Sequence, residues 1–480
     1  MVRDDRLYSG ASSRYFGNHS SQTSEDPIGP LFERSWFHRM WTVQEVTLSH
    51  LDRTVFRCGS TEFPWTALIL ALDGLQPEKY RWCRWQEATS LQKQFTIYLS
   101  VRRYKGVKEL LDGNSPNSHN EPLVFHILTN TRGKKATNPK DKIFSLYGLL
   151  SELEIPFPAP DYSKSVEDVY REAVISSIDY DKNLYILYHA PSDRRRDGLA
   201  SWVPDWSEDG WDEEDSRYGL LRNRFAASGP GIPKWRFSED HSALILVGKL
   251  VDTVIFRTDP MPPFSSIEAV AEKITKRSML GEVDPGRAWR DEFFSLYHQG
   301  YSVFKPWVEI SQWSDYPTGE PTKEALQRTL VNDNPKSNAE AAKNNSFDHW
   351  YDIMTLDQLD TVERAINNVH TGPEQRIRQE PYLRRICRNA IKDTIPDAQL
   401  SFSALKGPAS EFHPLAMAFS QKKCFFYTQN YYFGTAPDPL PTPVQSGDRI
   451  AVVSGLEMPL LLRPVEGGYR LLTHVYQWSR

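Results

Sequence analysis

This 480-residue chain has few cysteines and no long hydrophobic run. Its four cysteines, at positions 58, 83, 387 and 424, form no C-x-x-C pair and have no histidine at metal-ligand spacing. We therefore expect free buried thiols rather than a disulfide framework or a zinc site, and we predict no metal. The longest apolar run is ALILAL at 67 to 72, far short of the roughly 20 residues that span a bilayer.

An excess of charge of one sign is also lacking. The chain carries 57 basic and 62 acidic residues, for a net charge of −5, which is too near neutral to drive binding to nucleic acids or anionic membranes. Residues 1 to 30 show no basic start followed by an apolar run, so no secretory signal is visible. These absences predict a cytoplasmic protein with no membrane span and no nucleic-acid partner.

Aromatic residues, in contrast, are abundant: they make up 12% of the chain and include 14 tryptophans, which favours substantial cores over general disorder. The length allows two or three domains. Changes in composition divide the chain into a loop or disordered lead-in, a helical part, an acidic linker, and a β-rich region that contains a helical insertion at about 266–420. In that order, the four segments are 1–30, 31–206, 207–234 and 235–480.

Local signals predict the helices of the first half. The apolar spacing favours one helix from Leu31 to Leu48. Asn138 and Pro139 have the residue types of an N-cap and a first helical position. Ser165 and Asp168 have the spacing of a capping box ahead of an apolar face.

Strand-like segments flank the helical insertion. One lies near 234 to 256, where KWRFSEDHSALILVGKLVDTVIF predicts a hairpin or meander. Four more follow in the last sixty residues, as KKCFFYT, DRIAVVSG, MPLLLRPV and GYRLLTHVYQW. Because antiparallel edges are satisfied most easily by closing on one another, we predict a small β-barrel or sheet interrupted by helices. The fold class expected for the whole chain is α+β.

Common catalytic signatures are absent. The sequence has no phosphate-binding loop, no G-x-G-x-x-G, no H-E-x-x-H and no G-x-S-x-G. This weakens nucleotide-triphosphate, metalloprotease and α/β-hydrolase interpretations.

Four stretches taken together resemble the fungal heterokaryon incompatibility domain, or HET domain. They are WFHRMWTVQEVTLS, ATNPKDKIFSLYGLL, PDYSKSVEDVYREAV and SWVPDWS, and the tail SGDRIAVVSGLEMPLLLRPVEGGYRLL is similar to the C-terminal region of many such proteins. The strands that usually open the domain do not appear before Leu31. The resemblance therefore implies a truncated TIR-like α/β unit, mainly helical, followed by the family's β-rich region.

The resemblance also nominates two residues. TIR domains that cleave NAD use a glutamate on a helix, and WTVQEV places Trp41 and Glu45 at the separation of the plant TIR motif. Glu45 would be the catalytic carboxylate, stabilising positive charge on the ribose by roughly 4 kcal/mol, and Trp41 its packing neighbour on the cofactor-binding side. The alternative is a solvent-facing Glu45 paired with Arg34, His38 or Arg39.

Three functions follow from the resemblance. The first is a HET-family protein of non-self recognition and programmed cell death, which acts through a protein partner or self-association, without a cofactor and without enzymatic activity. The second is a TIR-like NAD glycohydrolase that uses Glu45, with NAD as its substrate. The third is an inactive fragment of a larger HET protein.

Overall fold

The computed structural model describes about half of the chain as two separate compact units. The first unit comprises Met1–Arg222 and Ile232–Leu246, and the second comprises Asn223–Gly231 and Val247–Arg480. The expected lead-in at 1–30 and most of the expected acidic linker lie outside the described residues. Those described are 34–49, 53–65, 67, 122–190, 196–207, 225–262, 277, 303–333, 337–339, 345–355, 408–438 and 442–477.

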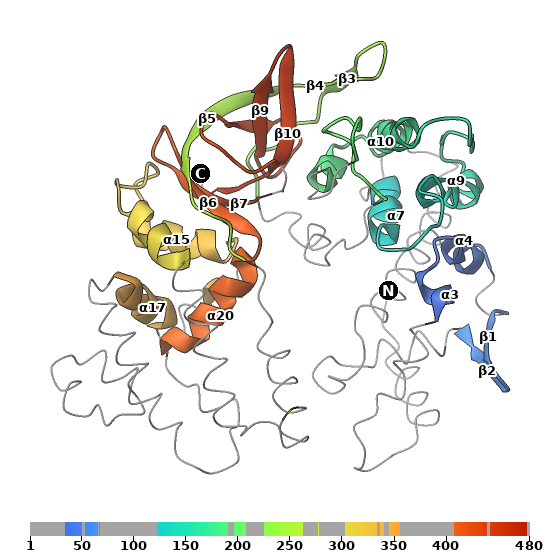
Figure 1. Ribbon diagram of the computed structural model, residues 1–480, viewed down its shortest axis with the longest axis horizontal. Helices are drawn as coiled ribbons and strands as arrows, with labels where there is room; N and C mark the ends of the chain where they lie inside the picture. The colour runs from blue at the N-terminus through green and yellow to red at the C-terminus, as the bar shows by residue number, and fades with distance from the viewer. Residues whose placement is uncertain are drawn as a thin grey trace. The chain divides into compact units, whose positions relative to one another are not determined.

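The described part of the first unit is mainly helical, with two small antiparallel hairpins (Figure 1). One hairpin, formed by β3 (Trp235–Phe237) and β4 (Leu244–Leu246), contacts the longest described helix, α10 (Val166–Asp181), where Trp235 Nε1 donates to Asp179 Oδ1 at 3.0 Å. The elements of this unit are α3 (Ser35–His38), α4 (Thr42–Thr47), β1 (Val55–Cys58), β2 (Thr61–Pro64), α7 (Leu123–Thr131), α8 (Asp141–Phe144), α9 (Tyr147–Glu152), α10 (Val166–Asp181), η1 (Tyr185–His189), β3 (Trp235–Phe237) and β4 (Leu244–Leu246).

Helix α10 begins and ends as its local sequence dictates. The Ser165 hydroxyl accepts a hydrogen bond from the Asp168 amide at 3.0 Å, which confirms the predicted cap. The helix ends at Asp181; the C-cap residue Lys182 donates its amide to the Ile178 carbonyl and has a left-handed backbone (φ 54°), a common way for a helix to stop. Its buried face packs against α7, α8 and η1.

The continuous helix expected over 31–48 is wrong at its centre. Between α3 and α4 the backbone is extended at Arg39 (φ −76°, ψ 138°), where Arg39 forms a parallel β-bridge with Lys135. The Lys135 amide donates to the His38 carbonyl at 2.6 Å, and the Met40 amide donates to the Lys135 carbonyl at 2.9 Å. The main chain at 38–40 therefore pairs with another segment instead of continuing the helix.

The second unit is built on an antiparallel sheet with the order β10-β9-β8-β5-β6-β7-β11. Because Val475 alone separates β10 from β11, one continuous chain segment supplies both ends of this order, and the sheet curls into a half-barrel. Small and aliphatic side chains, with Cys424 and Phe426, fill its core. The strands are β5 (Gly248–Arg257), β6 (Lys423–Thr428), β7 (Phe433–Pro437), β8 (Arg449–Val453), β9 (Leu460–Val465), β10 (Gly468–His474) and β11 (Tyr476–Gln477).

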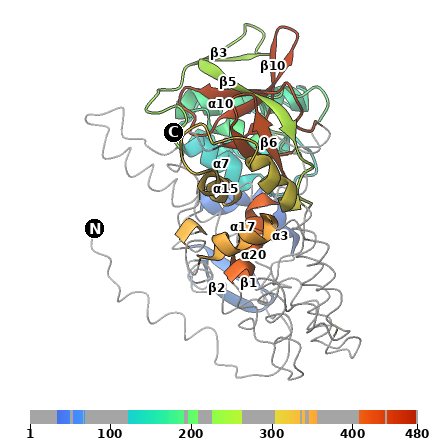
Figure 2. The same cartoon turned by 90° about the vertical axis from the view of Figure 1, so that its left-hand side faces the viewer.

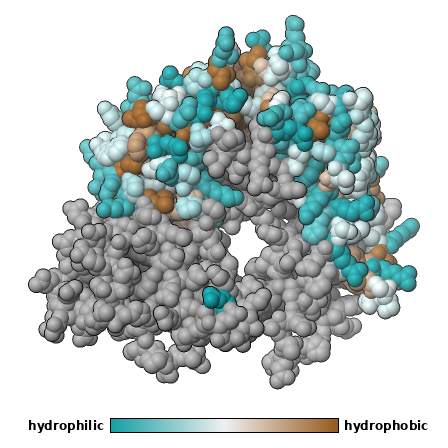
Figure 3. Space-filling model, viewed as in Figure 1, coloured by the Kyte–Doolittle hydropathy of each residue, from teal (hydrophilic) through white to brown (hydrophobic). Residues whose placement is uncertain are grey.

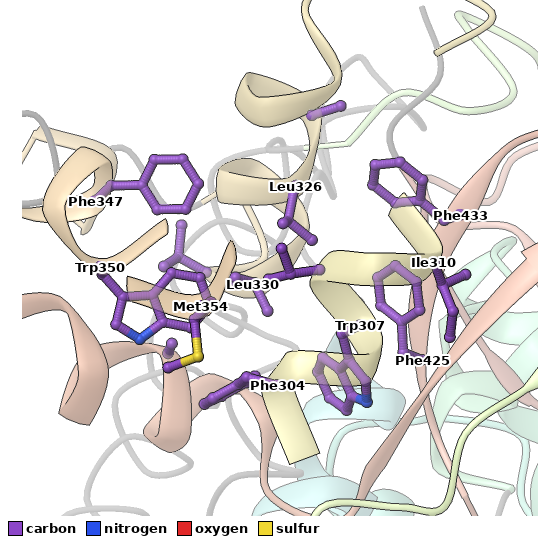
Figure 4. Close-up of a cluster of buried hydrophobic side chains, with 14 of the residues drawn as sticks. Phe304, Trp307, Ile310, Leu326, Leu330, Phe347, Trp350, Met354, Phe425 and Phe433 are labelled. Atoms are coloured by element: carbon purple, nitrogen blue, oxygen red, sulfur yellow. The ribbon is translucent and has the colours of Figure 1, made fainter. Parts of the chain in front are cut away.

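Helices connect β5 to β6, although these two strands are neighbours in the sheet. The described helices of this connection are 303–311, α15 (Thr322–Leu330), α17 (Ser346–Thr355) and α20 (Pro408–Ser420). They share a second core with the outer face of β6 and β7, in which Trp307 stacks on Phe425 at 5.4 Å between ring centroids (Figure 4). Strand β6 is therefore buried on both faces. The β9–β10 hairpin extends away from these helices (Figures 1 and 2).

The predicted α+β class is confirmed, since a helical N-terminal part precedes an antiparallel half-barrel sheet. Six strands form that sheet, and the two-residue β11 extends it. In the described part of the chain, no helix is long and apolar enough to cross a membrane. The described surface is mostly hydrophilic in the view of Figure 3, with hydrophobic residues in small patches.

Candidate functional site

Basic side chains are buried where the first two stretches of the resemblance meet. Arg132, Lys134 and Lys142 are only 1%, 3% and 4% exposed. The Lys134 ammonium donates to the Phe37 carbonyl at 2.5 Å, and the Lys142 ammonium donates to the carbonyls of Arg132, at 3.0 Å, and Lys134. Because a buried ammonium group is costly without acceptors, these carbonyls fix the loop after α7 against α3 and α8.

Arg132 extends this network to the fourth stretch, SWVPDWS. Its guanidinium donates to the His189 carbonyl at 2.6 Å and to the Asp205 carbonyl at 2.9 Å. The buried Asp205 carboxylate in turn accepts hydrogen bonds from the Arg196 amide at 2.8 Å and from the Ser207 amide at 2.9 Å. Arg132 thus ties the end of α7 to two later turns of the chain.

Tyr170 brings in the third stretch. It is fully buried, its hydroxyl donates to the Pro139 carbonyl at 2.9 Å, and its ring packs edge-on against Trp206 at 5.2 Å. Burial raises the pKa of Tyr170, so the hydroxyl stays a neutral donor. All four stretches of the resemblance are therefore joined within the first unit, in a region that we call the basic junction: Phe37, Arg132, Lys134, Lys142, Tyr170, Asp205 and Trp206.

Asp181 fixes the start of the helix that leads into the basic junction. Pro122 at the N-cap of α7 supplies no side-chain cap. The Asp181 carboxylate, from the end of α10, accepts the amides of Val124 at 3.1 Å and Phe125 at 2.7 Å instead. Burial raises the pKa of Asp181 to about 7, although these hydrogen bonds act in the opposite direction. A tertiary contact thus replaces the local cap.

The nominated pair lies on α4, next to the basic junction in the sequence. Trp41 is the N-cap residue, and the Glu45 amide donates to its carbonyl at 3.4 Å, so the two residues are one turn apart. Trp41 is half-buried and Glu45 is exposed. Of the described residues, none forms an ion pair with Glu45, including the alternative partners Arg34, His38 and Arg39.

An exposed carboxylate has limited chemical power. Water screens its charge, whereas electrostatic catalysis depends on groups preorganised in a site from which water is excluded. Among the described residues, no side chain forms a hydrogen bond or an ion pair with the Glu45 carboxylate. The catalytic role of Glu45, and the role of Trp41 beside it, stay predictions.

Sequence reasoning missed the burial of Lys142. The two residues before it, Lys140 and Asp141, both bond Tyr162: the Lys140 ammonium donates to its carbonyl at 2.7 Å, and its hydroxyl donates to Asp141 at 2.6 Å. Asn138 caps the Lys140 amide at 3.1 Å, one residue before the start of α8. The available signal for Lys142 was its position at the head of the apolar run IFSLYGLL.

Among the described residues, Cys58 and Cys424 are free thiols, and no group of three His, Cys, Asp or Glu side chains could hold a metal ion. Positions 83 and 387 lie outside the described residues. Comparison with known proteins finds no family model, no curated protein and no solved structure that matches this chain.

Proposed function

We propose that this chain is a fungal HET-family protein that acts in non-self recognition and programmed cell death, mainly through protein contacts. The observation that carries the proposal is the basic junction. Stretches as distant as 36–49 and 201–207 are joined through Lys134 and Arg132. The four stretches resemble parts of one known domain, and here their residues share one buried network. This supports the proposal that they belong to a single domain.

The proposed architecture of residues 31–206 is the second half of a TIR-like α/β unit. Parallel strand pairing is typical of α/β units. The Arg39–Lys135 bridge is parallel. In the sequence, Arg39 lies between α3 and α4, and Lys135 lies between α7 and α8. This bridge favours the proposed architecture.

The tail supports the proposal in a second place. The resemblance there is to a glycine-aspartate strand, a proline-containing strand and an arginine-ended strand. Asp448 of the glycine-aspartate pair forms an ion pair with Arg463, at an Nε–Oδ1 distance of 2.8 Å. This ion pair within the matching stretch supports the proposal.

The test is expression of the full chain in fungal cells, with growth and viability as the readout. We expect growth arrest or death. Lys142→Met, which removes an ammonium group from the basic junction, should restore growth, whereas Lys249→Met at an exposed position of β5 should not. Normal growth of cells that accumulate the intact chain would contradict the proposal.

A further inference from the structure

Arg39 and Lys135 are held side by side at the surface. They are the two partners of the parallel bridge, and both are exposed. Bridge partners lie about 5 Å apart with their side chains on the same face. The bonds that fix them are main-chain bonds, at 2.6 Å and 2.9 Å, so the pairing does not depend on either side chain.

Among the residues that the structure describes, this pair of like charges has no counter-charge. Within the described part of the chain, neither side chain makes an ion pair or a side-chain hydrogen bond. Like charges directly opposite each other destabilise a strand pair. The bridge therefore places two positive charges, those of Arg39 and Lys135, next to each other on the surface.

We propose that Arg39 and Lys135 together bind a pyrophosphate group. A guanidinium offers a planar fork that matches two phosphate oxygens, and an ammonium group offers a compact point charge. Two adjacent cations suit two linked phosphates. A single carboxylate carries one negative charge and would neutralise only one of the two cations. The group can come from inorganic pyrophosphate or from a dinucleotide. This inference is independent of the proposed function in cell death.

The experiment is calorimetric titration of the full chain with sodium pyrophosphate and, separately, with NAD, against sodium chloride of equal ionic strength. We expect binding of pyrophosphate that weakens by about tenfold or more in Arg39→Gln and in Lys135→Gln. The matched control, Lys249→Gln, should bind as the unaltered chain does. Binding of NAD with the same losses identifies a dinucleotide as the source, and binding of the inorganic ion alone identifies free pyrophosphate. Both support the site.

Two results would overturn it: heat of binding no larger than that with sodium chloride, or unchanged affinity in both glutamine variants.

A charge reversal gives a second, independent readout. Arg39→Glu converts the repulsion with Lys135 into attraction, so at low salt and without anion its melting temperature should rise by about 1–3 °C. The same variant should lose pyrophosphate binding. Lys135→Glu should also raise the melting temperature and lose pyrophosphate binding. Agreement between the two variants separates the effect of the charge pair from an unrelated effect at either position. A melting temperature that is unchanged or lowered in both variants would show that the two cations do not act on each other and would overturn the proposal.

Discussion

Arg463 donates two parallel hydrogen bonds to the buried carboxylate of Asp448. Their lengths are 2.8 Å from Nε to Oδ1 and 2.9 Å from Nη2 to Oδ2, and Asp448 is 0% exposed. The Gln445 amide donates to the same carboxylate at 2.8 Å, and Arg463 also donates to the Pro443 carbonyl at 2.7 Å. The pair thus joins the turn before β8 to the neighbouring strand β9.

Loss of Arg463 should destabilise the half-barrel severely. Arg463→Met leaves the Asp448 carboxylate buried without its counter-charge, which costs about 3–5 kcal/mol. Arg470→Met is the matched control, because Arg470 lies opposite Arg463 in the sheet and is exposed; it should change the free energy of unfolding by less than about 0.5 kcal/mol. Hydrogen exchange of the β6 amides measures the difference. Equal protection in the two variants would rule this role out.

Acid should destabilise the second unit through His413. This histidine is buried, its Nδ1 accepts a hydrogen bond from Trp350 Nε1 at 3.0 Å, and burial lowers its pKa to about 3. A histidine in the unfolded chain titrates near about 6.5, so as the pH falls the unfolded chain takes up the proton first. Stability present above about pH 6.5 is therefore lost as the pH falls toward 3, by up to about 1.4 kcal/mol per pH unit.

The variant His413→Gln keeps an acceptor for Trp350 and removes the titration. Its melting temperature should depend less on pH between 6.5 and 4 than that of the unaltered chain. Buried His474, whose pKa burial also lowers to about 3, maintains part of the slope. Exposed His241→Gln serves as the control. Identical slopes for His413→Gln and the unaltered chain would refute the assignment.

Gly248 permits the close approach of β5 to β8. A Cβ atom at this position would lie 2.6 Å from the Val452 carbonyl oxygen and 3.1 Å from the Val453 Cα, and neither main-chain atom can move aside without disturbing the strand pair. We expect Gly248→Ala to lower the free energy of unfolding by about 1–3 kcal/mol. A Cβ atom at Gly468 in β10 would have no atom within 4 Å. Gly468→Ala should therefore change the free energy of unfolding little. Denaturant unfolding compares the two, and equal stability would contradict the packing described.

The protein-contact proposal predicts no NAD hydrolysis that depends on Glu45. Purified protein incubated with NAD should release nicotinamide at the rate of a protein-free sample, and Glu45→Ala should still arrest fungal growth. The control is Glu239→Ala, at another exposed glutamate. Nicotinamide release that disappears in Glu45→Ala and persists in Glu239→Ala would instead establish the NAD glycohydrolase.

Features set by neighbouring residues were predictable from the sequence. The start of α10 follows from Ser165 and Asp168, whose bond is local. The one-turn separation of Trp41 and Glu45 is likewise local. The sheet was predictable from the composition of the tail, because the β-branched and aromatic residues that favour strands recur there.

Features set by distant partners were not predictable. Nothing in the helical pattern of 31–48 reveals that the main chain at Arg39 pairs with Lys135, about a hundred residues away. The burial of Lys142 depends on the carbonyls of Arg132 and Lys134, which have no side-chain signature. The curl of the half-barrel depends on the break at Val475 between β10 and β11.

The central claim is that the basic junction joins the four stretches into one buried unit, and Lys134 tests it most directly. Lys134→Met keeps the length of the side chain and removes the donor to Phe37. Hydrogen exchange of the full chain should then show lost protection at the Met40 and Lys135 amides, which form the bridge, and unchanged protection in the strands of the half-barrel. Full protection of both bridge amides in this variant would contradict the account.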